Sequence, residues 1–249
     1  MLKPLRYGWH LLVVATLLLF VAVPWAEFID GKVSLMAILQ GPSWAHPLGT
    51  DNLGRDLLLR FSDSFAQAIL PLWGITVLAT LVGVALTVVM QAFQSHPGAR
   101  AFGSVVTTAA AGVMSVPLGI GVFLLAVALD SMGLWPLTIG LGTVFLARVI
   151  LSLWNMYWRD SKLEYWSAHR AMGGTPWQRV VQYGVAGIWR GELFRDLAFH
   201  LQVAVSIEAS LSYLGFGIQE PQASIGNILA SHFDRFLKGE FWVLGCCIA

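Results

Sequence analysis

Five long apolar runs constrain the fold of this chain more than any other feature of its sequence. They cover residues 7–26, 65–93, 101–129, 134–158 and 197–216, and each holds 20 to 29 residues. A helix of about 20 residues spans the hydrocarbon core of a bilayer, which is about 30 Å thick. Only 12% of the chain is charged, about half the share of an ordinary soluble domain. The chain is therefore predicted to be an all-α, polytopic helical membrane protein.

The last apolar stretch, residues 241–249, is much shorter than these runs. Its nine residues are fewer than half of the roughly 20 that a spanning helix needs. It is either the start of a short or truncated sixth helix or an interfacial tail, and the sequence leaves both open. We expect a single transmembrane domain over residues 1–249, with five complete transmembrane helices plus this partial sixth.

The distribution of charge predicts the orientation of these helices. With the N-terminus in the cytoplasm, the turn 94–100 and the polar segment 159–196 lie inside, and the loops 27–63 and 217–240 lie outside. The inside segments then carry nine basic and four acidic residues, whereas the outside segments, with Asp130, carry five basic and nine acidic residues. Because basic residues favour cytoplasmic loops, this orientation is the expected one.

The polar segment 159–196 begins with signals for a short helix. Ser161 and Glu164 match the Ser-x-x-Glu capping box, in which each side chain satisfies a backbone donor of the other residue. Gly173 and Gly174 are typical of a helix end, because glycine readily adopts the left-handed conformation found there. The sequence therefore predicts a first helix over residues 162–172.

A second helix is predicted directly after this break. Thr175 and Gln178 match another capping box, and Pro176 stands at the first helical position, where its missing N–H has no partner to lose. The two helices form either a well-capped cytoplasmic loop or a rigid element that docks into another protein.

Three stretches of the chain resemble one protein family. Residues 164–177 read EYWSAHRAMGGTPW and resemble the EAA loop of permease subunits in bacterial ATP-binding-cassette (ABC) importers. Residues 46–58, HPLGTDNLGRDLL, resemble the external segment before the second helix in the dipeptide, oligopeptide and nickel branch. Residues 208–219, EASLSYLGFGIQ, resemble the end of the fifth helix and the start of the loop beyond it. The resemblance implies the type I, MetI-like fold and a multi-pass location in the bacterial inner membrane.

The resemblance also implies that the segment 159–196 is the cytoplasmic coupling loop of the importer. Glu164, Arg170 and the Tyr165–Trp166 pair would contact an ATPase subunit, and the break after the first helix would hold the shape of the loop. The residues assigned to coupling are Glu164, Tyr165, Trp166, Ala168, Arg170, Ala171, Gly173, Thr175 and Pro176.

The chain departs from the family pattern inside this loop. Ser167-Ala168-His169 stands where the family usually has Glu-Ala-Ala, and the later Leu-Pro of the family falls near Val185-Ala186. These departures and the short tail suggest an alternative, a degenerate or scaffolding subunit that assembles without efficient transport. An ion-driven secondary transporter is a further alternative. An intramembrane enzyme would need a paired nucleophile and base, and none is evident.

The resemblance implies partners that supply what the chain lacks. No Gly-x-x-x-x-Gly-Lys-Ser/Thr phosphate loop occurs in the sequence, so the chain is not expected to be an enzyme or to hold a cofactor. ATP would be hydrolysed by two ABC ATPase subunits, with a second, similar permease subunit beside this one in the lipid bilayer. An external substrate-binding protein would deliver peptides, nickel or another small cargo. No basic block indicates a nucleic-acid partner.

Glu208 is the one acidic residue clearly inside an apolar run. Ionisable groups in such places often serve function. Ala204, Glu208 and Ser212 lie four residues apart on one helix stripe, with Gln202 on a neighbouring stripe. Such stripes form either helix-packing seams or a polar translocation path, and the candidate path residues are Gln202, Glu208 and Ser212.

The remaining polar features predict no chemistry. The six histidines contain no His-x-x-x-His pair, and Cys246 and Cys247 match neither a zinc site nor a structural disulfide. We therefore expect no metal site. The segment 46–60 is either an interfacial elbow that aims the second helix or part of an external mouth for the binding protein.

Overall fold

The computed structural model describes residues 37–128 and 133–239, and every regular element in that part of the chain is a helix. The expected helices at 7–26 and 241–249 lie outside the described residues. The chain divides into two compact units. One unit includes residues 37–65 and 228–239, and the other covers residues 66–227 apart from 129–132. The prediction of an all-α protein is confirmed for the described residues.

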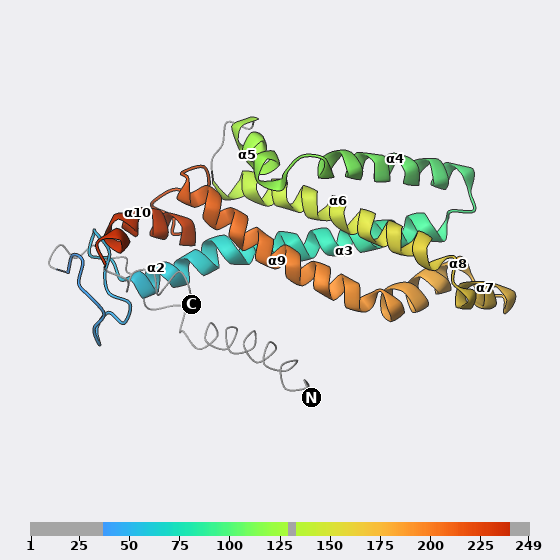
Figure 1. Ribbon diagram of the computed structural model, residues 1–249, viewed down its shortest axis with the longest axis horizontal. Helices are drawn as coiled ribbons and strands as arrows, with labels where there is room; N and C mark the ends of the chain where they lie inside the picture. The colour runs from blue at the N-terminus through green and yellow to red at the C-terminus, as the bar shows by residue number, and fades with distance from the viewer. Residues whose placement is uncertain (1–36, 129–132, 240–249) are drawn as a thin grey trace. The chain divides into compact units, whose positions relative to one another are not determined.

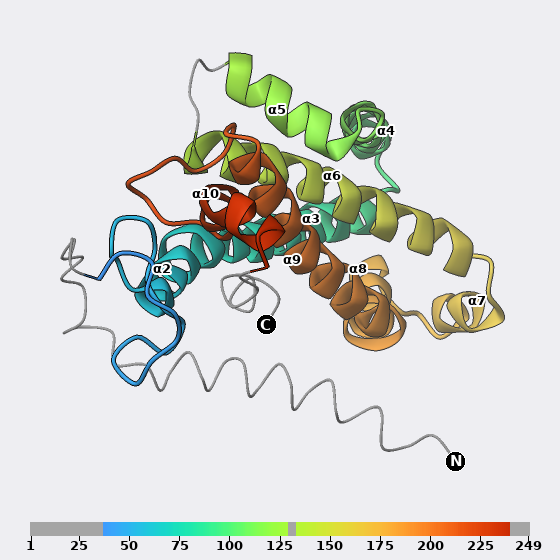
Figure 2. The same cartoon turned by 60° about the vertical axis from the view of Figure 1, so that its left-hand side comes forward.

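Three long helices run side by side through the larger unit (Figure 1). They are α3 (Leu70–Ala92), α6 (Leu134–Asp160) and α9 (Arg190–Tyr213). On the other side of α6 lie α4 (Pro97–Met114) and α5 (Leu118–Ala128), as the turned view in Figure 2 also shows. Between α6 and α9 the chain forms three short elements: α7 (Glu164–Ala171), α8 (Pro176–Gln178) and the π-helix η2 (Arg179–Ile188).

The smaller unit is built around α2 and most of α10. Helix α2 (Leu57–Ser64) continues through a π-helical turn, η1 (Phe65–Ile69), into α3. Helix α10 spans Ile225–Leu237. Leu57 of α2 and Ile228 of α10 are both buried and share a small apolar core, against which Leu48 packs.

Two described helices are long and apolar enough to cross a membrane, namely Leu57–Ala92 and Leu134–Asp160. The pair Pro97–Met114 and Leu118–Leu125 would be a third span if counted together, although it is bent by 93°. Helix α9, which carries ionisable residues at its start and in its middle, is not among them. The observed bounds are Leu134–Asp160 where 134–158 was expected, and Arg190–Tyr213 where 197–216 was expected.

The structure divides the expected helix 101–129 into α4 and α5. The break falls at Ser115–Pro117. Proline lacks the N–H that a helix interior uses, and it disfavours the helical conformation of the residue before it. At the other end, Pro97 occupies the first position of α4, so this helix begins four residues before the expected start.

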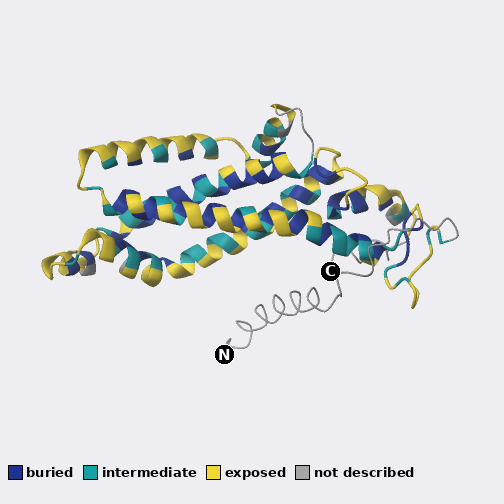
Figure 3. Ribbon diagram, turned by 180° about the vertical axis from the view of Figure 1, so that it is seen from behind, coloured by how far each residue is buried: buried dark blue, intermediate teal, exposed yellow. Residues whose placement is uncertain are grey.

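Burial is arranged as expected for a helix bundle in a membrane. Figure 3 shows that buried residues lie on the faces that α3, α6 and α9 turn toward one another, whereas exposed residues follow the outer faces. Many of the exposed residues are large and apolar, among them Leu81 on α3 and Val105 on α4. Such a surface is unusual for a soluble monomer and suits contact with lipid or a partner subunit.

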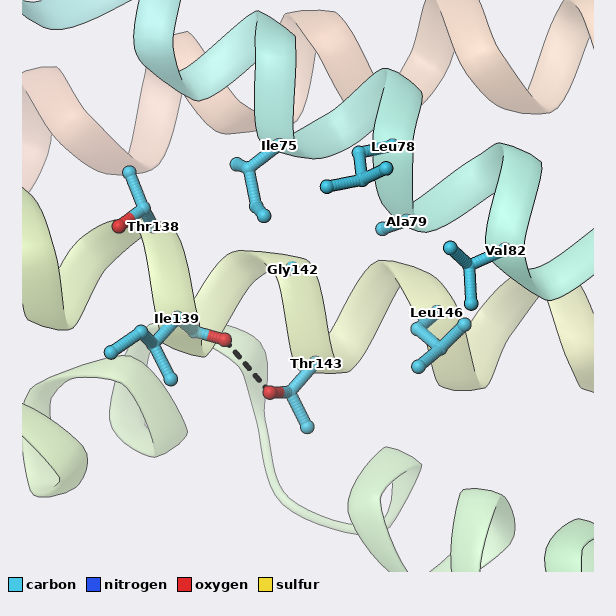
Figure 4. A pocket seen from close by; sticks show the side chains of 9 residues that line it. All are labelled: Ile75, Leu78, Ala79, Val82, Thr138, Ile139, Gly142, Thr143 and Leu146. Carbon is cyan, nitrogen blue, oxygen red and sulfur yellow. Dashed lines mark hydrogen bonds between the residues drawn. The ribbon is translucent and has the colours of Figure 1, made fainter.

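Helices α3 and α6 approach each other closely because small residues face large ones. A methyl group on Gly142 of α6 would lie 2.8 Å from a carbon of Ile75, and one on Gly83 of α3 would lie 2.9 Å from Val149. Beside this contact lies a shallow apolar groove of about 320 Å³ (Figure 4). Its lining residues are Ile75, Leu78, Ala79, Val82, Thr138, Ile139, Gly142, Thr143 and Leu146.

The buried hydroxyl groups of α3 are satisfied within the helix itself. Thr76, Thr80 and Thr87 each donate to the carbonyl four residues before them, at 2.7, 2.8 and 2.7 Å. Gln91 is different, because its amide nitrogen donates across to the carbonyl of Leu153 in α6 at 3.0 Å. Each of these buried hydroxyl groups therefore has a hydrogen-bond acceptor, although it lies inside an apolar bundle.

Candidate functional site

The first predicted capping box is wrong. Ser161 terminates α6, and its hydroxyl donates to the carbonyl of Trp158 at 3.0 Å. Helix α7 begins at Glu164, after Leu163, whose side chain makes no capping hydrogen bond. The expected helix over 162–172 is therefore eight residues long and spans Glu164–Ala171.

The predicted break after α7 is confirmed. Gly173 has a φ of +80°, the left-handed conformation that glycine adopts readily. Its N–H donates to the carbonyl of Arg170 at 3.1 Å, and the N–H of Gly174 donates to His169 at 3.0 Å. These bonds satisfy carbonyls that the end of the helix would otherwise leave open.

The second capping box is also confirmed. The N–H of Gln178 donates to the Thr175 hydroxyl at 3.2 Å, and the N–H of Thr175 donates to the Gln178 side chain at 3.0 Å. Pro176 occupies the first helical position. The sharp turn between α7 and α8 is thus specified by residues next to one another in the sequence.

His169 stands where the family pattern has alanine, and its ring packs onto the turn. The side chain is buried, and a methyl group on Gly174 would lie only 1.7 Å from its Cε1 atom. Gly174 is therefore required by close contact, in contrast to Gly173, which is required by its backbone conformation.

Trp166, one of the predicted coupling residues, is buried in this chain. It is only 2% exposed. It packs in a core cluster with residues of α3, α6 and η2. Its ring lies 6.3 Å from that of Trp189 and meets Tyr157 of α6 edge-on at 5.7 Å. Trp166 thus packs α7 against the long helices, and its predicted role in coupling stays a prediction.

Several other predicted coupling residues remain on the surface. Glu164, Ala168, Arg170 and Ala171 of α7 are exposed, as are Gly173, Thr175 and Pro176. Tyr165 lies in α7, and its side chain is outside the description. Two large apolar residues, Met172 and Trp177, are 76% and 51% exposed beside them. The acidic start and basic end of α7 complement its helix dipole.

Four residues around α7 that were not predicted to matter hold the segment in place. The indole N–H of Trp189 donates to Oδ2 of Asp160 at 2.7 Å, and Nε of Arg159 donates to Oδ1 at 2.7 Å. Trp189 and Asp160 are 1% and 3% exposed. Gly184 lies against the Trp189 ring, where a methyl group would come within 2.5 Å of a ring carbon. No local sequence pattern links residues 29 positions apart, so sequence reasoning missed these contacts.

The predicted path residues do not share one surface. Glu208 and Ser212 are buried, and the Ser212 hydroxyl donates to Oε1 of Glu208 at 2.8 Å. Gln202 is exposed on another face of α9. Ala204, on the same stripe as Glu208, is fully buried in the main core. Ala204 and Glu208 thus pack inside the described part of the chain, and a role of the stripe in a translocation path stays a prediction.

Beyond Ser212 the chain folds back onto the end of α9. The N–H of Ile218 donates to the Ser212 hydroxyl at 2.9 Å. Asn227 donates to the carbonyls of Ile218 and Gln222, at 3.3 and 2.8 Å. Ser224 and Asn227 also cap the start of α10 reciprocally, at 3.1 Å each way. Glu208 thus lies beneath a loop that several hydrogen bonds hold together.

In the smaller unit, Asp51 organises the segment between residues 46 and 60. The side chain is fully buried and accepts hydrogen bonds from the backbone N–H groups of Leu53 and Arg55, both at 2.8 Å. The side chains of Arg55 and Arg60 donate to it at 2.6 and 2.9 Å. Nearby, Asp56 caps α2 and lies 2.8 Å from Nδ1 of His46. This network fits the interpretation of the segment as an elbow before the second helix.

The network also changes the acidity of Asp51. Burial alone would raise the pKa of its carboxyl, but the hydrogen bonds from Arg55, Leu53 and Arg60 outweigh burial and lower the pKa below its usual value. A lowered pKa stabilises the folded state above the ordinary pKa of about 4. That stabilisation is lost as the pH falls through the folded pKa.

We therefore expect the stabilising contribution of Asp51 to the folded state to be lost in acid. Between pH 7 and about pH 4 its contribution is constant, and below about pH 4 it declines. The check is the melting temperature of the purified protein in detergent from pH 7 to pH 3, compared with Asp51→Asn. The difference between the two proteins should shrink below pH 4, and a constant difference would contradict the assignment.

No group of three or more His, Cys, Asp or Glu side chains that could hold a metal ion occurs among the described residues. Cys246 and Cys247 lie outside them. The expectations that the chain holds no metal and no cofactor stay predictions.

Comparison with known proteins adds what geometry alone does not give. No family model matches the chain. A protein of Brucella suis named as a peptide permease is 28% identical over 225 residues, which cover 88% of this chain and 71% of the relative. The oligopeptide transport system permease protein OppC of Mycobacterium tuberculosis is 29% identical over 230 residues, covering 87% and 74%. The dipeptide transport system permease protein DppC of Bacillus subtilis is 27% identical over 206 residues, covering 82% and 61%.

The chain is similar to permease subunits of ABC importers, on the dipeptide and oligopeptide branch. The similarity extends over most of the sequence and therefore includes far more than the EAA-like loop. The names of these relatives refer to peptides and not to nickel. Its long apolar helices and its similarity to these permeases support a multi-pass membrane protein.

Proposed function

We propose that this permease forms part of the path by which an importer of peptides carries them across the bacterial inner membrane. A second, similar permease subunit completes the path, and an external binding protein delivers the peptide. Two ATPase subunits dock on the cytoplasmic face at α7. The N-terminus lies in the cytoplasm in this arrangement, in agreement with the distribution of charge. Peptide is the cargo that the names of the relatives support.

The observation that carries this proposal is the form of α7. One side of the helix is anchored by buried Trp166, and the opposite side presents Glu164, Ala168 and Ala171 to solvent. Arg170 is exposed near the end of the helix. Small residues such as Ala168 and Ala171 let another backbone come close, and Arg170 and Glu164 supply charge for orientation. A short helix with a fixed position and a free outer face is suited to a groove of a partner.

In the proposed mechanism, binding of the ATPase subunits is linked to a change between two packings of the membrane helices. The ATPase subunits must bind one packing better than the other, because a partner that binds both equally shifts nothing. A coupling free energy of about 1–3 kcal/mol is typical of such systems. In this proposal ATP binding draws the ATPase subunits together, α7 moves with them, and the helices change between inward-open and outward-open packings.

Gly173→Val tests the proposal. Valine strongly disfavours the φ of +80° at this position, so the turn after α7 should change shape and the ATPase-facing surface should tilt. We expect ATP-dependent uptake of labelled di-, tri- and pentapeptides into vesicles containing the full importer to fall by roughly tenfold or more, as for a change of about 1.4 kcal/mol in coupling.

Gly98→Val is the matched control. Gly98 lies at the start of α4, is exposed, and has no atom within 4 Å of the position of an added methyl group. The Gly98→Val variant should transport peptides as the unmodified protein does. Normal uptake by Gly173→Val with intact assembly would remove α7 from the mechanism. Assembly of the unmodified importer without any uptake would instead favour a scaffolding subunit.

A further inference from the structure

Movement of α7 can affect transport only if it reaches the membrane helices. A flexible connection would absorb the displacement, whereas a rigid one would pass it on. The connection between α7 and the long helices lies in the described residues between the end of α6 and the start of α9. Of the residues that make its buried contacts, only Trp166 belongs to the predicted coupling set.

We propose that Trp166, Trp189, Asp160 and Gly184 form a rigid joint that transmits the movement of α7 to α6 and α9. This inference rests on the proposed function and identifies positioning residues for it. None of the four needs to touch an ATPase subunit or a peptide. Trp166, Trp189 and Asp160 are each at most 3% exposed, and Gly184 is buried.

The first part of the joint is aromatic packing. The rings of Trp166 and Trp189 are nearly parallel, with an interplanar angle of 29° and centroids 6.3 Å apart. Tyr157 of α6 meets Trp166 edge-on at an angle of 82°. Trp166 thus lies in contact with α6 on one side and with the residue that precedes α9 on the other. Stacked and edge-to-face pairs of this kind have preferred geometries and resist sliding.

The second part is a directional hydrogen bond. The indole N–H of Trp189 donates to Oδ2 of Asp160 at 2.7 Å, at the last residue of α6. Arg159 donates to the other carboxylate oxygen and also lies 3.5 Å from Glu192 of α9. Asp160 therefore fixes the end of α6 to the start of α9 through a buried, charge-assisted bond, which is stronger than a neutral one.

The third part is the wide turn of η2. The N–H of Trp189 donates to the carbonyl of Gly184 at 2.9 Å, five residues earlier, as in a π-helix. The side chain of Trp189 also lies over Gly184, so closely that any larger residue there would collide with the ring. The π-helical turn and the glycine together fix the position of Trp189. Single π-helical turns occur frequently at functional sites.

The contacts of Trp189 give two separable variants. Trp189→Phe keeps an aromatic ring but removes the donor to Asp160, and Gly184→Ala displaces the ring and leaves Trp189 intact. In the full importer in vesicles, both should lower the number of peptides imported per ATP hydrolysed by roughly tenfold, the scale of one hydrogen bond to a charged acceptor. Labelled tripeptide and inorganic phosphate release are the two measurements.

Two substitutions of Asp160 test whether its hydrogen bond with Trp189 is needed for coupling. Asp160→Asn keeps an oxygen that accepts from Trp189 but loses the charge, so the import ratio should fall by about fivefold at most, less than with Trp189→Phe. Asp160→Leu removes the acceptor and should lower the ratio as Trp189→Phe does. Gly191→Ala is the control, because an added methyl group there meets no atom within 4 Å.

The outcomes separate this inference from the proposed function. An unmodified importer without ATP-dependent uptake would overturn the proposed function. Normal ratios in Trp189→Phe, Gly184→Ala and Asp160→Leu, beside a coupled unmodified importer, would overturn the joint alone. Failure of all three variants to co-purify with the ATPase subunits would make the cluster a folding core and would also overturn the joint.

Discussion

Gly226→Ala is expected to destabilise the fold strongly, because the added methyl group has no room. The added carbon would lie 2.2 Å from the carbonyl oxygen of Ala209 and 2.8 Å from both the backbone nitrogen of Tyr213 and the Cβ of Ser212. Two of these atoms belong to the backbone of α9 and cannot rotate away. We expect a loss of about 3 kcal/mol or more, the upper end for overpacked interiors.

The measurement is the free energy of unfolding of the full-length protein in detergent, or the fraction that remains folded after heating. Gly191→Ala is the matched control within α9 and should be neutral or more stable by up to about 1 kcal/mol, because alanine favours helices over glycine. Equal stability of Gly226→Ala and Gly191→Ala would show that the loop after Tyr213 does not pack on α9.

The second large effect is expected for Asp51→Ala. The substitution removes the carboxylate that accepts from Arg55 and Arg60 and from two backbone N–H groups. Arg60 is itself only 5% exposed, so its charge would remain buried without this partner. Breaking a buried ion pair from one side costs about 3–5 kcal/mol. We expect a loss of that size, measured by unfolding at pH 7.

Asp234→Ala provides the comparison in the same unit. Asp234 lies on α10 and is exposed, so its removal should change stability by less than about 0.5 kcal/mol. Asp51→Asn should fall between the two, because an amide keeps the shape and one acceptor but not the charge. A small effect of Asp51→Ala at pH 7 would mean that the network does not hold the segment together.

The parts of the site that sequence predicted correctly are governed by neighbours in the chain. Thr175, Pro176 and Gln178 form their capping box because all its atoms lie within four residues. Gly173 ends α7 for the same reason, since its conformation depends on its own missing side chain. Local rules of this kind need no knowledge of the fold.

The parts that sequence missed depend on residues brought together by packing. Ser161 matched a capping box, yet α6 continues to Asp160, whose side chain bonds to Trp189. The resemblance to the EAA loop assigned Trp166 to the contact with an ATPase subunit, but it did not reveal that Trp166 packs against Trp189 and Tyr157. The apolar runs marked where helices form, but Pro117 divided one of them.

The threonines of α3 have a consequence for how this bundle can move. Thr76, Thr80 and Thr87 direct their hydroxyls into their own helix, so these side chains create no polar cross-links between neighbouring helices. Where α3 meets α6 near Gly142 and Ile75, the contact is instead one of shape. A small shift at this contact would break none of these threonine hydrogen bonds, whereas the bond from Gln91 to the carbonyl of Leu153 would resist it.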